Sequence, residues 1–96
     1  GDEARLYYLR QHIRYPEAAM KKEIQGVVIV VFIIEPDGSV TKVSVSKGIG
    51  GGCDEEAIRV TREMPRWEPG KRNGRAVRVM LRMPIIFSLP GHPARR

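Results

Sequence analysis

The chain has 96 residues, of which 42% are hydrophobic and 29% are charged, and its net charge is +6. This length allows one domain with one modest core, and the composition excludes an intrinsically disordered chain. The longest apolar run, Val27 to Ile34, is far shorter than the roughly 20 residues that a membrane-spanning helix requires. The basic residues are spread out rather than clustered, so the charge favours anionic partners in general without marking a nucleic-acid-binding arm.

The first part of the chain predicts two short helices. Asp2 can cap the N-terminus of a helix that runs to about His12. Its apolar stripe consists of Leu6, Leu9 and Ile13. Pro16 restricts the residue before it and suits the first position of a second helix, Glu17 to Lys22.

A β-hairpin is expected next. Val27 to Glu35 is rich in β-branched residues and apolar on both faces, which predicts a strand covered on both sides. The helices could cover one face, and a partner chain or a further helix the other. The segment from Glu35 to Gly38 reads Glu-Pro-Asp-Gly, a turn signal, and Val40 to Lys47 then returns as an amphipathic second strand.

A glycine-rich loop, residues 48–52, leads into the strongest predicted helix, Asp54 to Met64. The loop nearly matches a dinucleotide-binding pattern, but the carboxylates in the first helical turn would repel a pyrophosphate and the chain is too short for such a fold. Cys53 is the only cysteine, so an intrachain disulfide is excluded, and we expect a buried thiol that behaves as a small apolar group.

The last predicted element is one long strand, about Arg75 to Leu89, after a loop over Trp67 to Gly74. Every second residue from Val77 is apolar, which places the alternate residues on the outward face: Arg78, Met80, Arg82, Pro84, Ile86 and Ser88. Pro84 has no N–H to donate to a neighbouring strand, so this strand is expected at an edge. The predicted fold is α+β, a three-stranded antiparallel sheet with the helices packed on one face.

An edge that carries Pro84, Arg78 and Arg82 has two interpretations. Proline and outward charges protect natural sheets from indiscriminate pairing. Alternatively, an exposed edge is kept for an extended peptide that adds to the sheet as a further strand. The residue pattern alone slightly favours protection.

The residues do not predict an enzyme. Neither His12 nor His92 has a second metal-binding residue at ligand spacing. The acidic trio Asp54, Glu55 and Glu56 suits the positive end of a helix dipole better than acid–base catalysis. No catalytic, metal or cofactor site is therefore predicted, and no cofactor is expected.

Six short motifs, in order along residues 15–89, resemble those of the C-terminal domain of TonB and TonB-like energy transducers. The motif at Cys53 to Ala57, read with the preceding Gly52, is GCDEEA, the form associated with Bacteroidetes-like members. The matching segments are Tyr15 to Ala19, Gln25 to Val28 with Val30 and Phe32, Asp37 to Val40, Cys53 to Ala57, Trp67 to Gly70 with Asn73 and Gly74, and Pro84 to Phe87. The resemblance divides the chain into an N-terminal helix (residues 1–14), the domain proper (residues 15–89) and a flexible tail (residues 90–96).

This resemblance implies a periplasmic domain of an inner-membrane-anchored protein. The expected partner is the TonB box, a short peptide of outer-membrane TonB-dependent transporters, and inner-membrane motor proteins would act through N-terminal segments that this chain lacks. We therefore expect an excised domain. The docking strand implied by the resemblance consists of Arg78, Val79, Met80, Leu81, Arg82, Met83, Pro84, Ile85 and Ile86.

Two alternatives remain open at this point. The chain could be a homodimerisation or interaction module fused to a membrane sensor or a metallopeptidase-like protein. It could also be a basic module that binds a wall polymer or nucleic acid, although the scattered charge makes a nucleic-acid partner unexpected.

Overall fold

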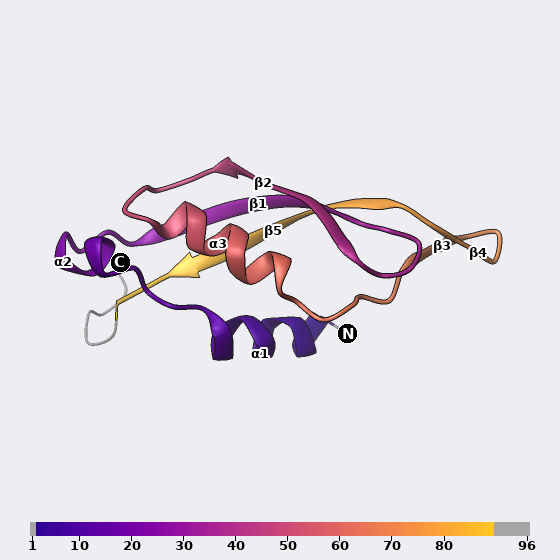
Figure 1. Ribbon diagram of the computed structural model, residues 1–96, viewed down its shortest axis with the longest axis horizontal. Coiled ribbons are helices and arrows are strands. Elements are labelled where there is room, and N and C mark those ends of the chain that lie inside the picture. Colours follow the sequence, from indigo (N-terminus) through magenta and orange to yellow (C-terminus); the bar gives the residue numbers. More distant parts are fainter. Residues whose placement is uncertain (1, 90–96) are drawn as a thin grey trace, which may run out of the picture.

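The computed structural model describes residues 2–89, with side chains from residue 7 onward, so the tail predicted for residues 90–96 lies outside the described residues. Figure 1 shows the helices and strands, and the elements up to α3 follow the predicted order. The helices and the first two strands begin and end within two residues of the predicted bounds. The helices are α1 (Asp2–His12), α2 (Glu17–Lys21) and α3 (Cys53–Arg62), and the strands are β1 (Gly26–Ile34), β2 (Val40–Lys47), β3 (Gly70–Arg72), β4 (Arg75–Val77) and β5 (Val79–Phe87).

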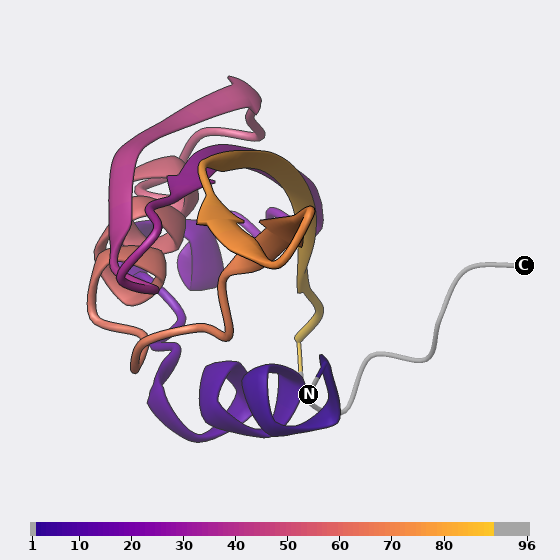
Figure 2. The ribbon, with the colours of Figure 1, turned by 90° about the vertical axis from the view of Figure 1, so that its right-hand side faces the viewer.

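The main sheet has three antiparallel strands in the order β2-β1-β5, which confirms the predicted α+β fold. Helices α1 and α3 lie on the same side of this sheet (Figures 1 and 2). Strand β5 pairs with β1 on one side only, so the last strand is an edge strand of the main sheet, as predicted.

The core lies between the sheet and α3. Strand β1 contributes the largest share through alternate residues, of which Val28, Val30 and Phe32 are completely buried. Helix α3 meets them with the face that carries Cys53, Ala57, Val60 and Thr61. The Thr61 hydroxyl donates a hydrogen bond to the Ala57 carbonyl oxygen (2.7 Å), which satisfies the one polar side chain among these residues.

Cys53 is fully buried at the start of α3, as expected. Burial raises the pKa of its thiol, and the neighbouring carboxylates of α3 raise this pKa further. The thiol therefore stays protonated and serves as a small packing group rather than as a nucleophile.

The prediction of one continuous last strand is wrong at its start. Arg75–Val77 forms β4, which pairs with β3 in a separate two-stranded ribbon rather than with the main sheet. The ribbon turns at Asn73 and Gly74, both of which have positive φ (52° and 78°), as a two-residue hairpin turn requires. The Asn-Gly pair is a strong hairpin signal, and it lies at the end of the predicted loop.

The expectation that β1 is covered on both faces is also wrong. Its second face carries Val27, which is 40% exposed, and the half-buried Ile29, Val31 and Ile33. No described element lies over this face, as the end-on view in Figure 2 shows. The side chains of neighbouring strands shield it only in part, because Pro84, Arg82 and Met80 lie beside these residues on β5.

Candidate functional site

β5 is an edge strand of the main sheet, and one side of its backbone is unpaired. On its other side β5 pairs with β1 without interruption over nine positions, from Gly26 opposite Phe87 to Ile34 opposite Val79. Within residues 2–89, no strand pairs with the free side. A strand of nine residues presents roughly 30 Å of backbone hydrogen-bonding groups to a partner.

Pro84 indicates which backbone N–H groups of β5 point away from β1, toward the free side of the strand. In an antiparallel pair, successive residues point their N–H and C=O groups alternately toward and away from the partner strand. The pairing with β1 runs past Pro84 without a bulge, so the Pro84 nitrogen, which cannot donate a hydrogen bond, is assigned to the side of β5 that points away from β1. The residues two and four positions away share this orientation, which leaves the N–H groups of Met80, Arg82 and Ile86 for a guest strand.

The side chains of the predicted docking strand divide as its alternation predicts. Ile85 is buried, and Val79, Leu81 and Met83 are half-buried on the core side. The opposite row is exposed and largely apolar, with Met80 69% and Ile86 70% exposed on either side of Arg82 and Pro84. This row can contact the outward side chains of an added strand.

Arg78 behaves differently from the other predicted docking residues. It lies between β4 and β5, outside the regular strand. Its guanidinium donates two hydrogen bonds to the carboxylate of Glu35, at 2.9 and 3.2 Å. Hydrogen bonds from the Thr41 hydroxyl and from Arg78 lower the pKa of Glu35, so the pair stays ionised. Arg78 thus fastens the start of β5 to the end of β1.

Arg82 has no such partner. The structure shows no carboxylate within ion-pair distance of it among the described residues. Its charge in the middle of the exposed row is therefore available to a ligand, in contrast to that of Arg78.

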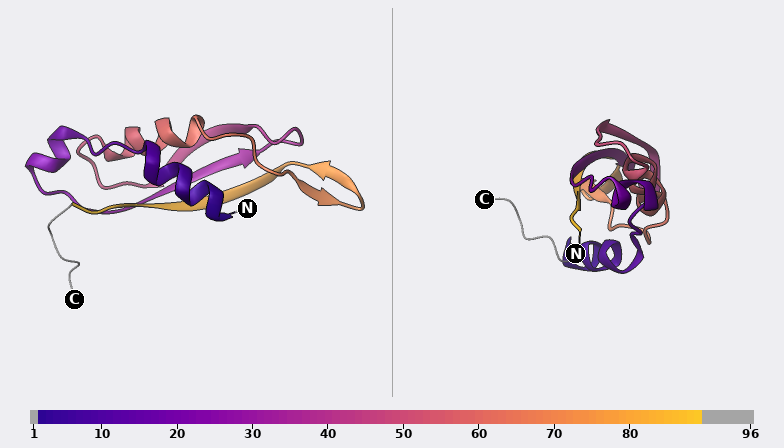
Figure 3. Two further views of the ribbon diagram at one scale, coloured as in Figure 1. Left: turned by 90° about the horizontal axis from the view of Figure 1, so that it is seen from below. Right: turned by 90° about the vertical axis from the view of Figure 1, so that its left-hand side faces the viewer.

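A groove of about 150 Å³ runs beside the second half of this edge. Figure 3 shows α1 running beside β5. One wall of the groove is formed by α1 and the residue that follows it, and the other by β5. Its lining residues are Leu9, Arg10, Ile13, Pro84, Ile85 and Ile86. The sequence pattern could not reveal this groove, because its two walls are more than 70 positions apart in the chain.

Three hydrogen bonds hold α1 and the residues after it against α3. The Tyr8 hydroxyl donates to the Glu63 carbonyl oxygen (2.6 Å), and the Arg14 backbone N–H donates to Glu56 Oε2 (2.7 Å). Arg59 donates to the His12 carbonyl oxygen at 3.0 Å and also to Glu56 at 2.7 Å. The wall that α1 forms is therefore fixed to the rest of the domain.

Glu56 is the centre of this network. Burial alone would raise the pKa of its carboxyl group, but hydrogen bonds from Arg59 and from the Arg14 N–H outweigh burial and hold the pKa below its usual value. The carboxylate is thus ionised at neutral pH, and Arg59 is protonated beside it.

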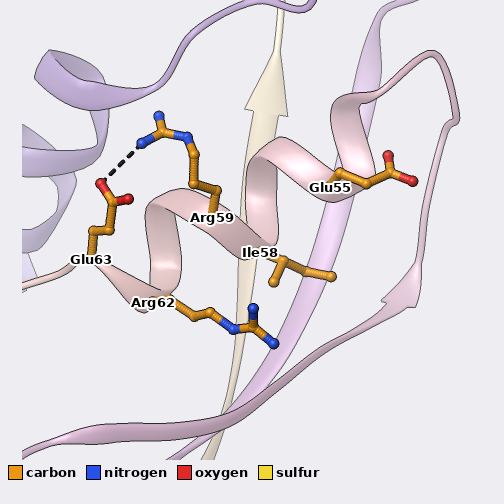
Figure 4. Close-up of a pocket in the computed structure, with 5 residues that line it drawn as sticks. All are labelled: Glu55, Ile58, Arg59, Arg62 and Glu63. Atoms are coloured by element: carbon orange, nitrogen blue, oxygen red, sulfur yellow. Dashed lines mark hydrogen bonds and ion pairs between the residues drawn. The ribbon is translucent and has the colours of Figure 1, made fainter.

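A second depression follows the exposed surface of α3 (Figure 4). The lining residues come from this helix and the residue that caps its end: Glu55, Ile58, Arg59, Arg62 and Glu63. Arg59 turns toward Glu63, while Ile58 and Arg62 point to the other side of the helix. Side chains that diverge in this way do not converge on a ligand, so we assign no site to them.

No group of three or more His, Cys, Asp and Glu side chains among the described residues could hold a metal ion.

Across residues 2–89, no helix has the length and apolar character needed to traverse a membrane.

Comparisons with known proteins agree with the fold. Residues 11–89 match the family model described as Gram-negative bacterial TonB protein C-terminal. Two solution structures of the Helicobacter pylori TonB C-terminal domain are similar. One is 27% identical with a TM-score of 0.69 and 95% of each chain covered, and the other is 28% identical with a TM-score of 0.67, covering 92% of this chain and 79% of that one.

The solution structure of the Pseudomonas aeruginosa TonB C-terminal domain shares the fold, with 24% identity, a TM-score of 0.62, and coverage of 83% of this chain and 81% of that one. No individually curated protein sequence matches the chain. The extent of the family match, together with the two Helicobacter pylori structures, establishes the relationship. This chain belongs to the TonB C-terminal domain family, the non-catalytic interaction domain of TonB-like energy transducers in the periplasm of Gram-negative bacteria.

Proposed function

We propose that this domain captures the TonB box of an outer-membrane transporter as an added strand along the free edge of β5. The observation that carries the proposal is the nine-residue edge, paired with β1 throughout and unpaired on its other side within the described chain. Strand addition draws affinity from main-chain hydrogen bonds and specificity from alternate side chains. Residues 79–86 supply both, whereas Arg78, the first residue of the predicted docking strand, is engaged by Glu35.

The edge suits a selective guest better than a purely protected surface. Pro84 removes one donor, which limits indiscriminate pairing, but the N–H groups assigned to Met80, Arg82 and Ile86 remain. The exposed side chains of Met80 and Ile86 give an added strand apolar surface to cover. Protection and docking therefore act on the same strand.

In this role the domain would be tethered to the inner membrane by a segment that precedes it. Motor proteins in that membrane would act through the tether, and the domain would transmit the force to the transporter peptide. The unbroken pairing of β5 with β1, together with the Arg78–Glu35 pair, would resist separation of the loaded strand.

A titration with amide resolution tests the proposal. The domain is labelled with ¹⁵N and titrated with a synthetic TonB box peptide, and a peptide of equal length with proline substituted at alternate positions serves as the control. We expect chemical shift changes to concentrate on residues 79–87 and to be absent with the control peptide, which cannot donate its share of hydrogen bonds. Changes confined to α3 or β2 would contradict the proposal.

A homodimer is a second candidate, favoured by the uncovered apolar face beside the same edge. Two copies could pair their β5 strands and bury Val27, Met80 and Ile86. Molecular mass measured by light scattering over a hundredfold range of concentration decides this point. A monomer throughout would exclude the dimer without affecting the peptide-binding proposal.

A further inference from the structure

We propose that the groove between α1 and β5 selects the guest by its side chains: it accepts a branched aliphatic residue and pairs Arg10 with a carboxylate two positions away in the guest. This inference rests on the proposed function, because the guest must first lie beside β5. It assigns a specificity role to α1, a helix outside the edge strand itself.

Strand geometry places the guest in the groove. Successive side chains of an added strand point to opposite faces of the sheet, about 6.5 Å separating residues on the same face. On one face they meet the exposed row of β5. On the other they meet the groove, where Ile85 of the core-facing row lies opposite α1.

The floor of the groove is apolar and already ordered. Leu9 is 6% exposed and Ile85 is 4% exposed, and Ile13 packs against the same core. A space of about 150 Å³ with such walls holds one branched aliphatic side chain, which favours leucine, isoleucine or valine in the guest. Because hydrogen bonds fix α1 to α3, little conformational entropy is lost when the groove is filled.

The rim of the groove is positive. Arg10 lines it, is exposed, and has no carboxylate within ion-pair distance among the described residues. Glu56 of α3 and Glu63 at its end are both bound by Arg59. A carboxylate on the same face of the guest, two residues from the aliphatic one, therefore finds an unneutralised guanidinium.

Designed peptides test both parts of the inference. Each is a blocked nine-residue peptide of serine and threonine that contains one leucine and one glutamate. In the same-face peptide the two lie two positions apart, and in the opposite-face peptide they lie three apart. A third peptide repeats the same-face spacing with lysine in place of glutamate. A natural TonB box peptide is titrated in parallel, and shifts at residues 79–87 report strand addition in every case.

We expect the same-face glutamate peptide to bind about fivefold more tightly than the opposite-face peptide, the size of effect that one exposed ion pair produces. The unchanged domain should also prefer the same-face glutamate peptide to the lysine peptide. In Arg10→Glu this preference for glutamate over lysine is expected to reverse. Arg62→Glu makes the same charge change on an exposed part of α3 away from the groove, and should leave the order unchanged. Replacing the leucine by serine should weaken binding about tenfold.

The outcomes separate the two proposals. If the TonB box peptide shifts residues 79–87 but spacing, charge reversal and the leucine have no effect, the groove inference is wrong and strand addition stands. If the TonB box peptide binds but the same-face peptide does not, the groove inference is also wrong and strand addition also stands. If no peptide, including the TonB box, shifts residues 79–87, both proposals are wrong.

Discussion

Pro84 lies directly opposite Ile29 in the pairing of β5 with β1, and the ladder continues on both sides of it. A proline is tolerated inside a strand only where its missing N–H would not have served the neighbouring strand. The pair Pro84–Ile29 thus defines the two sides of β5. One side is committed to the sheet, and the other is available to a partner.

Proline substitution at two adjacent positions of β5 should affect different properties: peptide binding at one position and stability at the other. Arg82→Pro removes a donor assigned to the free side, so we expect a stable fold and peptide binding weakened about tenfold, the worth of roughly one hydrogen bond. Met83→Pro removes a donor assigned to β1 and should destabilise the domain by about 2 kcal/mol. Arg82→Ala, which keeps the N–H, separates the loss of the donor from the loss of charge. Chemical denaturation and peptide titration measure the two effects, and equal destabilisation by both prolines would refute the assignment.

The ribbon of β3 and β4 should depend on its turn. Gly74 has φ of 78° and open space where a Cβ would lie, so Gly74→Val adds backbone strain without a steric clash. We expect a cost of about 1–2 kcal/mol, confined to the ribbon. Amide exchange should accelerate in residues 70–77 and stay unchanged in β1. Equal acceleration in both would show that the ribbon and the main sheet unfold together.

Glu56 should be the most sensitive side chain of the contact between α1 and α3. Glu56→Gln weakens charged hydrogen bonds from Arg59 and the Arg14 N–H, and we expect a loss of about 1.5 kcal/mol in the free energy of unfolding at neutral pH. Glu55→Gln, an exposed change one residue away on the same helix, is the matched control and should have little effect. Urea denaturation compares the two. A loss of equal size in both variants would mean that the effect comes from helix charge rather than from the network.

Asp37 should make the turn between β1 and β2 sensitive to acid. Hydrogen bonds from the Ser39 hydroxyl and backbone N–H, and one from Arg66, lower the pKa of Asp37 from 3.8 to about 2. Because the folded pKa lies below the unfolded one, the stabilisation is complete above about pH 4 and is lost as the pH falls toward 2. Ser39→Ala should move the carboxyl titration, followed by NMR, back toward 3.8. An unchanged titration would show that Ser39 does not lower this pKa.

The sequence pattern predicts much of the fold because local signals agree with the final contacts. Alternating apolar residues predict the faces of β5, and Pro84 predicts its place at an edge. The ribbon is not predicted because the apolar alternation runs on through Val77, which favours one continuous strand after a loop that contains Asn73 and Gly74. The groove depends on Leu9 meeting Ile85 across the fold, which no local pattern encodes.

The uncovered face of β1 illustrates the same limit. Val27, Ile29 and Val31 look like the residues of a fully buried strand, because β-branched residues on both faces usually indicate cover on both. In the structure the second face is shielded by the side chains of β2 and β5 rather than by a further layer. The residue pattern predicts that a face of the strand is apolar, but it does not predict which element covers that face.

Hydrogen exchange on the edge strand tests the central claim most directly. In the free domain, the amides of Met80, Arg82 and Ile86 should exchange rapidly, while those of Leu81 and Met83, which face β1, should be protected. A saturating TonB box peptide should protect Met80, Arg82 and Ile86 by an order of magnitude or more and leave their neighbours unchanged. If those three amides exchange as fast with the peptide bound as without it, the guest does not add as a strand to β5.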